Sequence, residues 1–144
     1  MNAINDRAAL AEAIFRPRAI ALIGATADQT KNNARAQRVL KKNGYAGRIL
    51  PINPRAAEIM GDAAYPDIRA APGPIDHAFI MVPASAVPDA IAGCVEKGVK
   101  VATLYSAGFA ETGAEGIERA LALLDFAGKR AAHRHVELLN AAAD

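Results

Sequence analysis

The stretches of this sequence best suited to chemistry are those that could hold a phosphorylated ligand. Gly24-Ala25-Thr26 follows the apolar run AIALI; a glycine there lets the backbone approach a phosphate, and the threonine hydroxyl can donate a hydrogen bond to it. Lys31 and Arg55 are cations that could pair with further phosphates, although a solvated surface role has equal weight for each. These residue types predict phosphate binding.

The sequence offers no comparable set for catalysis. No Ser, His and Asp residues are placed to form a nucleophilic triad, and no cluster has the spacing of metal ligands, so we name no catalytic and no metal-binding residue. His77 opens an apolar run, and His133 and His135 lie in a basic tail, so structural or solvated roles are expected for all three. Cys94 is the single cysteine and shares a helical spacing with Ile91, which predicts a core position.

The composition is that of one globular domain spanning residues 1–144. Of the 144 residues, 52% are hydrophobic and 22% are charged, enough to bury a core. No apolar stretch approaches the roughly 20 residues of a membrane span, and Asp6, Arg7 and Glu12 interrupt any signal peptide, so a cytoplasmic location is expected. The net charge of +2 is modest and the basic residues are scattered, so neither nucleic acid nor a membrane is expected as a partner.

Short apolar runs alternate along the chain with helical patterns. The runs at 19–24, 48–53, 77–82 and 99–106 predict strands, and 135–140 is a candidate fifth. The segments predicted as helices are 1–16, 32–43, 86–97 and 112–127, and the tail at 128–144 is poorly patterned apart from the candidate strand. Parallel neighbours need crossover helices, so the predicted fold is α/β, a Rossmann-like doubly wound parallel sheet with helices on both faces.

Apolar residues at helical spacing predict the core-facing side of three of these helices. They are Ile4, Ala8, Ala11 and Phe15 in the first helix, Ala36, Val39 and Leu40 in the second, and Ile117, Leu121 and Leu124 in the last.

Four unusual stretches follow the predicted strands, where ligands bind in open parallel sheets. They are Gly24-Ala25-Thr26, Asn53-Pro54-Arg55, Val82-Pro83-Ala84 and Ser106-Ala107-Gly108-Phe109. Each stretch alone is explained equally well by the glycine and proline residues that commonly end strands. Together they favour a ligand site at one edge of the sheet.

The choice of nucleotide follows from what the first two loops lack. A dinucleotide fingerprint needs three glycines as G-x-G-x-x-G and a carboxylate after the second strand. Here Gly24 is followed by no such glycines, and the second strand ends in Asn53. NAD is therefore disfavoured, and NADP and coenzyme A stay open.

Four segments in unbroken order, over about residues 14 to 118, resemble the CoA-binding domain of NDP-forming acyl-CoA synthetases. They read IFRPRAIALIGAT, GYAGRILPINPRAAEIMG, IDHAFIMVPASAVPDAI and GVKVATLYSAGFAETGAEG. The family includes succinyl-CoA ligase alpha subunits and ADP-forming acetyl-CoA synthetases.

The resemblance implies coenzyme A as the cofactor, and it implies which part of coenzyme A each of the four loops would contact. The loop at Gly24, Ala25 and Thr26 would approach the nucleotide and pyrophosphate, with Asn53-Pro54-Arg55 flanking the nucleotide. The loops at Val82-Pro83-Ala84 and Ser106-Ala107-Gly108 would line the path of the pantetheine arm.

The chain departs from the family pattern in its first loop and in its extent. Thr26 stands where the family usually has serine, and Lys31-Asn32-Asn33 replaces Lys-x-Gly, which puts the role of Lys31 in question. The phosphohistidine and ATP-grasp domains of the relatives are absent from this sequence. The resemblance thus implies a domain that positions coenzyme A for thioester formation, with those domains or subunits as partners. A small NADP-binding domain of an oxidoreductase and a ligand-free remnant are the alternatives, and a homodimer stays open.

Overall fold

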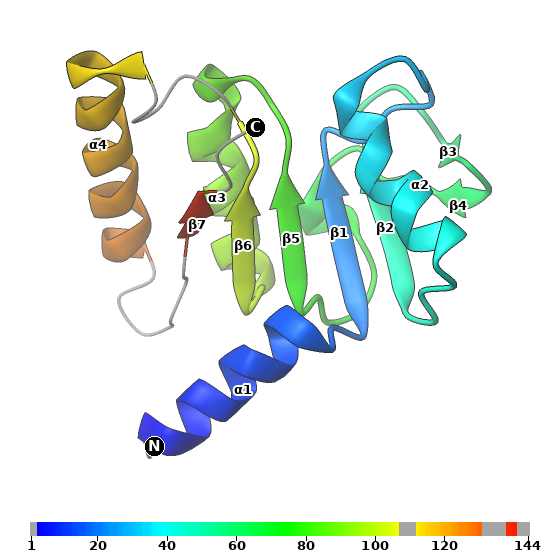
Figure 1. Ribbon diagram of the computed structural model, residues 1–144, viewed down its shortest axis with the longest axis horizontal. Coiled ribbons are helices and arrows are strands. Elements are labelled where there is room, and N and C mark those ends of the chain that lie inside the picture. Colours follow the sequence, from blue (N-terminus) through cyan, green and yellow to red (C-terminus); the bar gives the residue numbers. More distant parts are fainter. Residues whose placement is uncertain (1–2, 107–111, 131–137, 141–144) are drawn as a thin grey trace.

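The computed structural model describes residues 3–106, 112–130 and 138–140. Within these residues the main sheet has five parallel strands in the order β2-β1-β5-β6-β7 (Figure 1). The strands are β1 (Ala19–Ile23), β2 (Arg48–Ile52), β5 (His77–Ile80), β6 (Val101–Leu104) and β7 (Leu138–Asn140). The predicted Rossmann-like α/β fold is confirmed, and the candidate fifth strand is present as β7.

Strand β1 is an interior strand and is buried along its whole length, because a hydrophobic cluster covers each of its two faces. It lies between β2 and β5, with Leu22 opposite Pro51 on one side and Phe79 on the other. Pro51 cannot donate to a ladder, yet it is tolerated because β2 is an edge strand of the described sheet.

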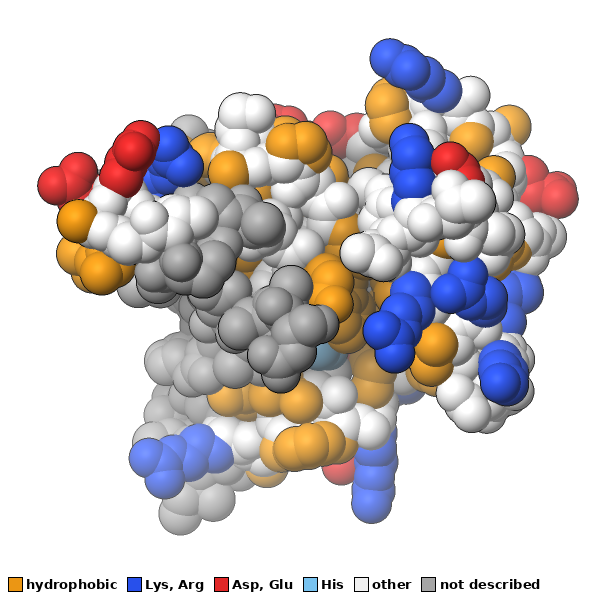
Figure 2. All heavy atoms as spheres, turned by 45° about the horizontal axis from the view of Figure 1, so that its top comes forward, with side chains coloured by type: hydrophobic (Ala, Val, Ile, Leu, Met, Phe, Trp, Pro, Cys, Tyr) orange, Lys and Arg blue, Asp and Glu red, His pale blue; other side chains and the backbone are white. Residues whose placement is uncertain are grey.

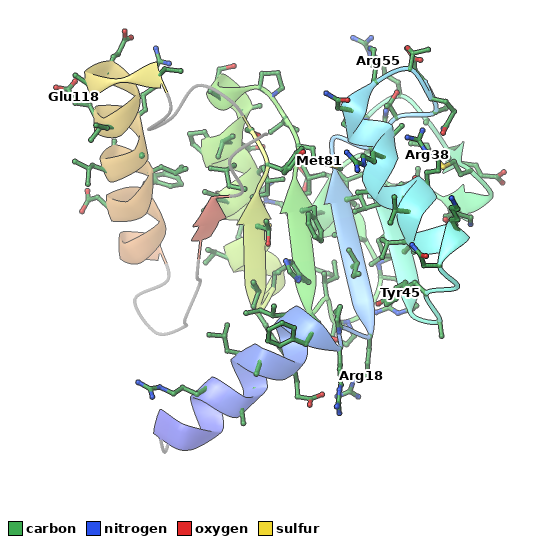
Figure 3. All side chains as sticks on the ribbon, in the orientation of Figure 1. Arg18, Arg38, Tyr45, Arg55, Met81 and Glu118 are labelled. Atoms are coloured by element: carbon green, nitrogen blue, oxygen red, sulfur yellow. The ribbon has the colours of Figure 1, made fainter. Side chains whose placement is uncertain are left out.

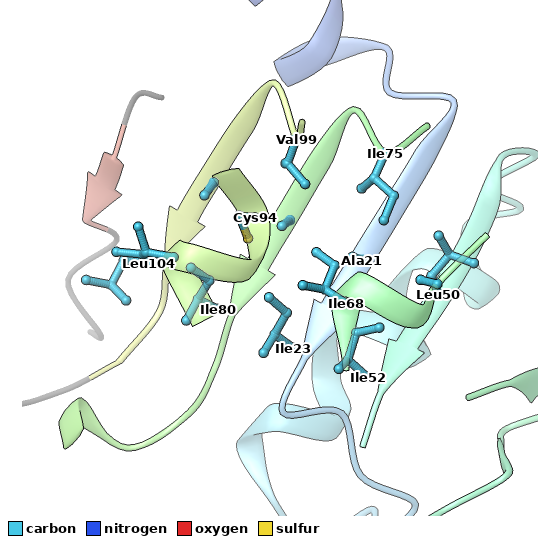
Figure 4. Packing of buried hydrophobic residues seen from close by; sticks show 14 of the residues in the cluster. Ala21, Ile23, Leu50, Ile52, Ile68, Ile75, Ile80, Cys94, Val99 and Leu104 are labelled. Carbon is cyan, nitrogen blue, oxygen red and sulfur yellow. The ribbon is translucent and has the colours of Figure 1, made fainter. Parts of the chain in front are cut away.

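Helices α3 (Val87–Lys97) and α4 (Ala114–Arg130) pack on one face of the sheet. Figure 4 shows the buried cluster on this face, which contains Ile23, Ile80 and Leu104 from the strands and Cys94 from α3. The core position predicted for Cys94 is confirmed, and burial raises the pKa of its thiol to about 12.

Helix α2 (Arg35–Lys42), preceded by the short turn η1 (Asn32–Ala34), covers the other face over β1 and β2. Its buried side includes Gln37, whose amide donates 2.8 Å hydrogen bonds to the Ile59 carbonyl and to the Asp62 carboxylate. These partners belong to a small hairpin of β3 (Glu58–Ile59) and β4 (Asp62–Ala63). The helix therefore faces the hairpin as well as the sheet.

Helix α1 (Ala3–Phe15) crosses the amino ends of the strands (Figure 1). It buries Ala13 near β6, and His77 at the start of β5 lies close by with its ring bonded to Thr103 over 2.7 Å. Burial lowers the pKa of His77, although the nearby Ala13 backbone opposes this shift. A structural role for His77 is confirmed, whereas His133 and His135 lie outside the described residues.

Several predicted core-facing residues are instead exposed. Phe15 is 80% exposed, Val39 42%, Ile117 48% and Leu121 61%. In α4 the physical reason is that the helix packs through Leu123 and its neighbours Ala120 and Phe126. In α2 the predicted residues Ala36 and Leu40 do pack against the core, and Val39 lies beside that buried side. Ala8 and Ala11 are exposed too, while the side chains of Ile4 and Leu124 lie outside the described part of the structure.

The described residues hold neither a membrane-spanning helix nor a cluster of metal ligands. No helix there is long and apolar enough to cross a membrane. No group of three or more His, Cys, Asp or Glu side chains in that same part of the chain is arranged to hold a metal ion.

Candidate ligand-binding site

A cavity of about 340 Å³, here called the rim pocket, lies at the carboxyl ends of β1, β2 and β5. Seven predicted site residues line it: Gly24, Ala25, Thr26, Lys31, Asn53, Pro54 and Val82. Arg55, Pro83, Ala84 and Ser106 lie outside its lining, and Ala107, Gly108 and Phe109 lie outside the described residues. The structure thus brings the first two loops and part of the third together.

Gly24 is required by the fold itself. Its φ of +92° suits glycine, and a Cβ built there would lie 2.5 Å from the Met81 carbonyl oxygen at the end of β5. Its N–H donates to the Ile52 carbonyl over 3.1 Å. The sequence suggested that a glycine is present here so that a phosphate can approach closely. The packing against Met81 requires a glycine even without a phosphate.

Two asparagines hold the carbonyl groups of the first loop. The Asn33 amide donates to the Gly24 carbonyl over 2.5 Å, and the Asn53 amide donates to the Ala25 carbonyl over 2.9 Å. Asn53 also accepts a 2.8 Å hydrogen bond from the N–H of Arg55, so it joins the loops after β1 and β2. Asn33, which stands where the family usually has glycine, thus stabilises this loop through its hydrogen bond to Gly24.

The first loop carries hydrogen-bond donors that have no partner within the described part of the chain. Within the described chain, the N–H groups of Thr26 and Ala27 make no hydrogen bond. The Thr26 hydroxyl oxygen accepts from the N–H of Asp28 over 3.2 Å, so its own hydrogen remains available to donate. This arrangement of donors suits an anion.

Lys31 is carried by a turn centred on Asp28. The Asp28 carboxylate accepts from the Thr30 hydroxyl over 2.6 Å and from the Thr30 N–H over 3.0 Å, and its carbonyl accepts from the Lys31 N–H. These Thr30 hydrogen bonds, with a smaller effect of the Lys31 charge, lower the pKa of Asp28. Lys31 lines the pocket and makes no ion pair with any residue that the structure describes.

Arg55 occupies a different position from Lys31. It is exposed in the turn above α2 (Figure 3) and does not line the rim pocket. The structure therefore favours Lys31 over Arg55 as the cation nearest to a ligand in this pocket.

A charged network on the far wall of the pocket was missed by the sequence reasoning. Arg69, in the turn η2 (Ile68–Ala70), pairs with Asp67 at 3.1 Å, Asp89 at 3.3 Å and Glu96 at 2.7 Å. The hydrogen bonds from Arg69 to Glu96, and next those to Asp67, raise the pKa of the guanidinium despite opposing burial.

Three carboxylates compensate the charge of Arg69, so Lys31 is the pocket cation more available to a phosphate. The sequence did hold a signal for this network. Pro66-Asp67-Ile68-Arg69 is typical of a capped turn, and the Asp67 side chain accepts the Arg69 N–H over 2.8 Å.

Ser106 links the third and fourth loops without lining the pocket. Its hydroxyl donates to the Val82 carbonyl over 2.5 Å and to the Ile80 carbonyl over 3.3 Å. Ala84, in η3 (Ala84–Ala86), lines a separate cavity of about 610 Å³ between α3 and α4. A binding role for these residues remains a prediction.

Comparison with known proteins identifies the family. Residues 18–138 match a family model described as "CoA binding domain". Acetate-CoA ligase (ADP-forming) II of Archaeoglobus fulgidus is 40% identical over 116 residues, which are 81% of this chain and 17% of that protein. The alpha subunit of acetate-CoA ligase (ADP-forming) II of Pyrococcus furiosus is 39% identical over 115 residues, 80% of this chain and 25% of that subunit.

A solved structure extends this likeness to the fold. The apo form of the dinucleotide-forming acetyl-coenzyme A synthetase 1 of Ca. Korarchaeum cryptofilum superposes with a TM-score of 0.81 at 35% identity. The match covers 90% of this chain and 28% of that one. The chain therefore spans between about a sixth and just over a quarter of the length of these three proteins.

Proposed function

This chain belongs to the CoA binding domain family, and from that premise we propose that it binds coenzyme A at the rim pocket. The observation that carries the proposal is the first loop. There Thr26, whose N–H makes no hydrogen bond within the described chain, and Lys31 both line the rim pocket and offer hydrogen-bond donors and a positive charge. Backbone donors and a cation of this kind suit a pyrophosphate or a ribose phosphate.

The size and lining of the rim pocket fit part of such a ligand. A cavity of about 340 Å³ is at the small end of the range for ligand sites, so it would hold the phosphorylated part of coenzyme A. The narrow pantetheine arm would leave past Val82 toward Ser106, Ala107 and Gly108, the stretch that the family resemblance assigns to its path. Pro83 and Ala84 would border that path, and Arg55 would flank the nucleotide from outside.

The proposed role is to hold coenzyme A while a thioester forms elsewhere. The two relatives from Archaeoglobus and Pyrococcus are named as ligases of acetate and coenzyme A, and one of them is a subunit. We name no catalytic residue in this chain, so the phosphoryl chemistry would fall to phosphohistidine and ATP-grasp domains or subunits. The thiol of a bound coenzyme A would supply the nucleophile; this chain would orient it. None of the three relatives described above is named as an oxidoreductase, so we do not propose a second function.

Calorimetric titration of the chain with coenzyme A, dephospho-CoA and NADP tests the proposal. We expect coenzyme A to bind and dephospho-CoA to bind more weakly, because it lacks the 3′-phosphate that a cation such as Lys31 would contact. NADP binding without coenzyme A binding would replace the proposal with a dinucleotide site. If none of the three compounds binds, this chain has the fold of the family but does not bind coenzyme A.

A further inference from the structure

The charged residues of this chain are unevenly divided along its length. Lys and Arg occur throughout the sequence, but residues 29–57 hold seven of the 17 Lys and Arg residues and none of the 15 Asp and Glu residues. The rest of the chain therefore has more carboxylates than cations. The basic segment includes η1, α2 and β2. Figure 2 shows Lys and Arg side chains close together on the side of the molecule that carries α2.

Two arginines of α2 have charges that no described carboxylate compensates. Arg35 and Arg38 are exposed, and neither makes an ion pair with any residue in the described part of the chain. Lys41 of the same helix is by contrast paired with Asp62 over 2.9 Å. Exposed charges without a partner contribute most to the electrostatic potential around a protein, and salt screens that potential.

Both arginines lie next to the rim pocket without lining it. Arg35 follows the pocket residue Asn33 by two positions, so their Cα atoms are at most about 7 Å apart. The Arg38 guanidinium donates to the backbone carbonyl of Gln29 over 3.3 Å and to its side-chain oxygen over 3.2 Å, so it lies against the first loop. These separations are comparable to the Debye length of about 10 Å at 0.1 M salt. Lys42 lies about 10 Å beyond Arg35 along the helix axis, so salt screens its charge from the pocket more strongly.

The far wall of the rim pocket has the opposite charge. Asp67, Asp89 and Glu96 there share the single guanidinium of Arg69, so the described carboxylates outnumber the cations. The pocket thus lies between a basic side, which continues from Lys31 into α2, and an acidic side next to α3. A ligand that is negatively charged at one end only would be attracted with that end toward α2.

Coenzyme A has this asymmetry of charge. Its phosphate monoester and its diphosphate lie at the nucleotide end and together carry about three to four negative charges at neutral pH. Its pantetheine arm is uncharged. An electrostatic potential that is positive on one side of the pocket would therefore act on the nucleotide end alone and would bring that end to the first loop.

We propose that Arg35 and Arg38 steer coenzyme A to the rim pocket by long-range attraction, without contacting the bound ligand. This inference rests on the proposed function, the binding of coenzyme A at that pocket. Steering charges act on the approach of a ligand, so these arginines raise the association rate constant and leave the dissociation rate constant unchanged. The cations that contact bound phosphate, such as Lys31, act on dissociation as well.

Stopped-flow mixing of the full chain with etheno-coenzyme A, a fluorescent analogue that keeps every phosphate, measures the two rate constants separately. The double variant Arg35→Gln with Arg38→Gln removes two charges at exposed sites, so the fold should persist. Its association rate constant should fall about fivefold at about 10 mM salt and less than about twofold at about 0.5 M salt, because salt screens the attraction. Its dissociation rate constant should equal that of the wild type.

Two double variants are the matched controls. Arg35→Lys with Arg38→Lys keeps both charges but removes the guanidinium groups that bond to Gln29, and it should associate at the rate of the wild type. Arg7→Gln with Lys97→Gln removes two charges from α1 and from the last turn of α3, at the amino edge of the sheet. It should also leave the association rate constant unchanged.

The outcomes separate this inference from the proposed function. An unchanged association rate constant of the glutamine variant at low salt would overturn the steering and leave coenzyme A binding intact. Faster dissociation of that variant would also overturn it, because the arginines would then contact the bound ligand. No binding by the wild type, checked with coenzyme A itself by calorimetry, would overturn both. If the double variant does not fold, Arg35→Gln alone replaces it, with a smaller expected fall in the association rate constant.

Discussion

At the scale of single residues, the form of the rim pocket depends mainly on side chains that hold the backbone in place. Side chains that could face a ligand contribute less to it. Asn33 and Asn53 hold consecutive carbonyls of the first loop, and Gly24 fits against the end of β5. These constraints fix the backbone of the loop that carries Thr26 before any anion arrives. Preorganised donors of this kind bind more tightly than flexible ones.

Replacement of Gly24 tests the steric constraint. Gly24→Ala should lower the free energy of unfolding by about 2 to 4 kcal/mol, because the new Cβ meets the Met81 carbonyl oxygen and the backbone has a positive φ. Gly61→Ala is the control: its φ is +84° but the space around it is open, so only the conformational cost of about 1 to 2 kcal/mol applies. Urea denaturation measures both, and equal losses would show that the close contact costs nothing.

Replacement of Lys31 tests the charge in the rim pocket. Lys31→Ala should weaken coenzyme A binding by about tenfold, the loss of one charge-assisted contact to phosphate. Lys42→Ala removes the same charge from an exposed position outside the pocket and should leave affinity unchanged. Arg55→Ala should have a smaller effect than Lys31→Ala in calorimetry; the reverse order would move the phosphate contact to Arg55.

At the scale of elements, Asp76 joins the starts of three strands. Its carboxylate accepts the Arg18 N–H over 2.7 Å before β1 and pairs with Lys100 over 2.9 Å before β6, and it directly precedes β5. Burial pushes the pKa of Asp76 up, but the hydrogen bonds from Lys100 and Arg18 outweigh it and lower the pKa overall. The carboxylate is thus held ionised where three elements begin.

The sign of this shift predicts an acid-dependent stability. A carboxylate with a lowered folded pKa stabilises the fold fully above its unfolded value of about 3.9, and that stability is lost as the pH falls through the folded pKa. Asp76→Asn should therefore lower the free energy of unfolding by about 1 to 3 kcal/mol at neutral pH, with the difference from wild type shrinking in acid. The exposed Glu58→Gln is the control, and a difference that does not change with pH would exclude this role for the Asp76 charge.

At the scale of the whole molecule, the proposed binding site and the polar contacts that fasten the strand starts lie at opposite edges of the sheet. The rim pocket lies at the carboxyl ends of the strands, whereas Asp76, His77 and α1 fasten the amino ends. Variants that damage the pocket side chains can therefore leave most of the fold intact. This separation makes ligand binding measurable through stability.

Coenzyme A should stabilise the whole chain by mass action. At a hundred times its Kd, the free energy of unfolding should rise by about 2.7 kcal/mol, and for Lys31→Ala at the same concentration by about 1.4 kcal/mol. Chemical denaturation with and without ligand measures this. Binding seen in calorimetry without such stabilisation would mean that coenzyme A also binds the unfolded chain.

The sequence by itself determined the alternation of strands and helices, the parallel sheet and the position of Gly24, Thr26 and Asn53 at the carboxyl edge of that sheet. Those features follow from apolar runs and the residues that end them, which act within a few positions of the chain. Only the tertiary structure decided that Val39 and Leu121 face outward, that Arg69 is held by three carboxylates and that Lys31, not Arg55, lines the pocket. The side of a helix that is buried and the partner of a charge depend on which distant segment packs beside them, and local periodicity carries no record of that choice.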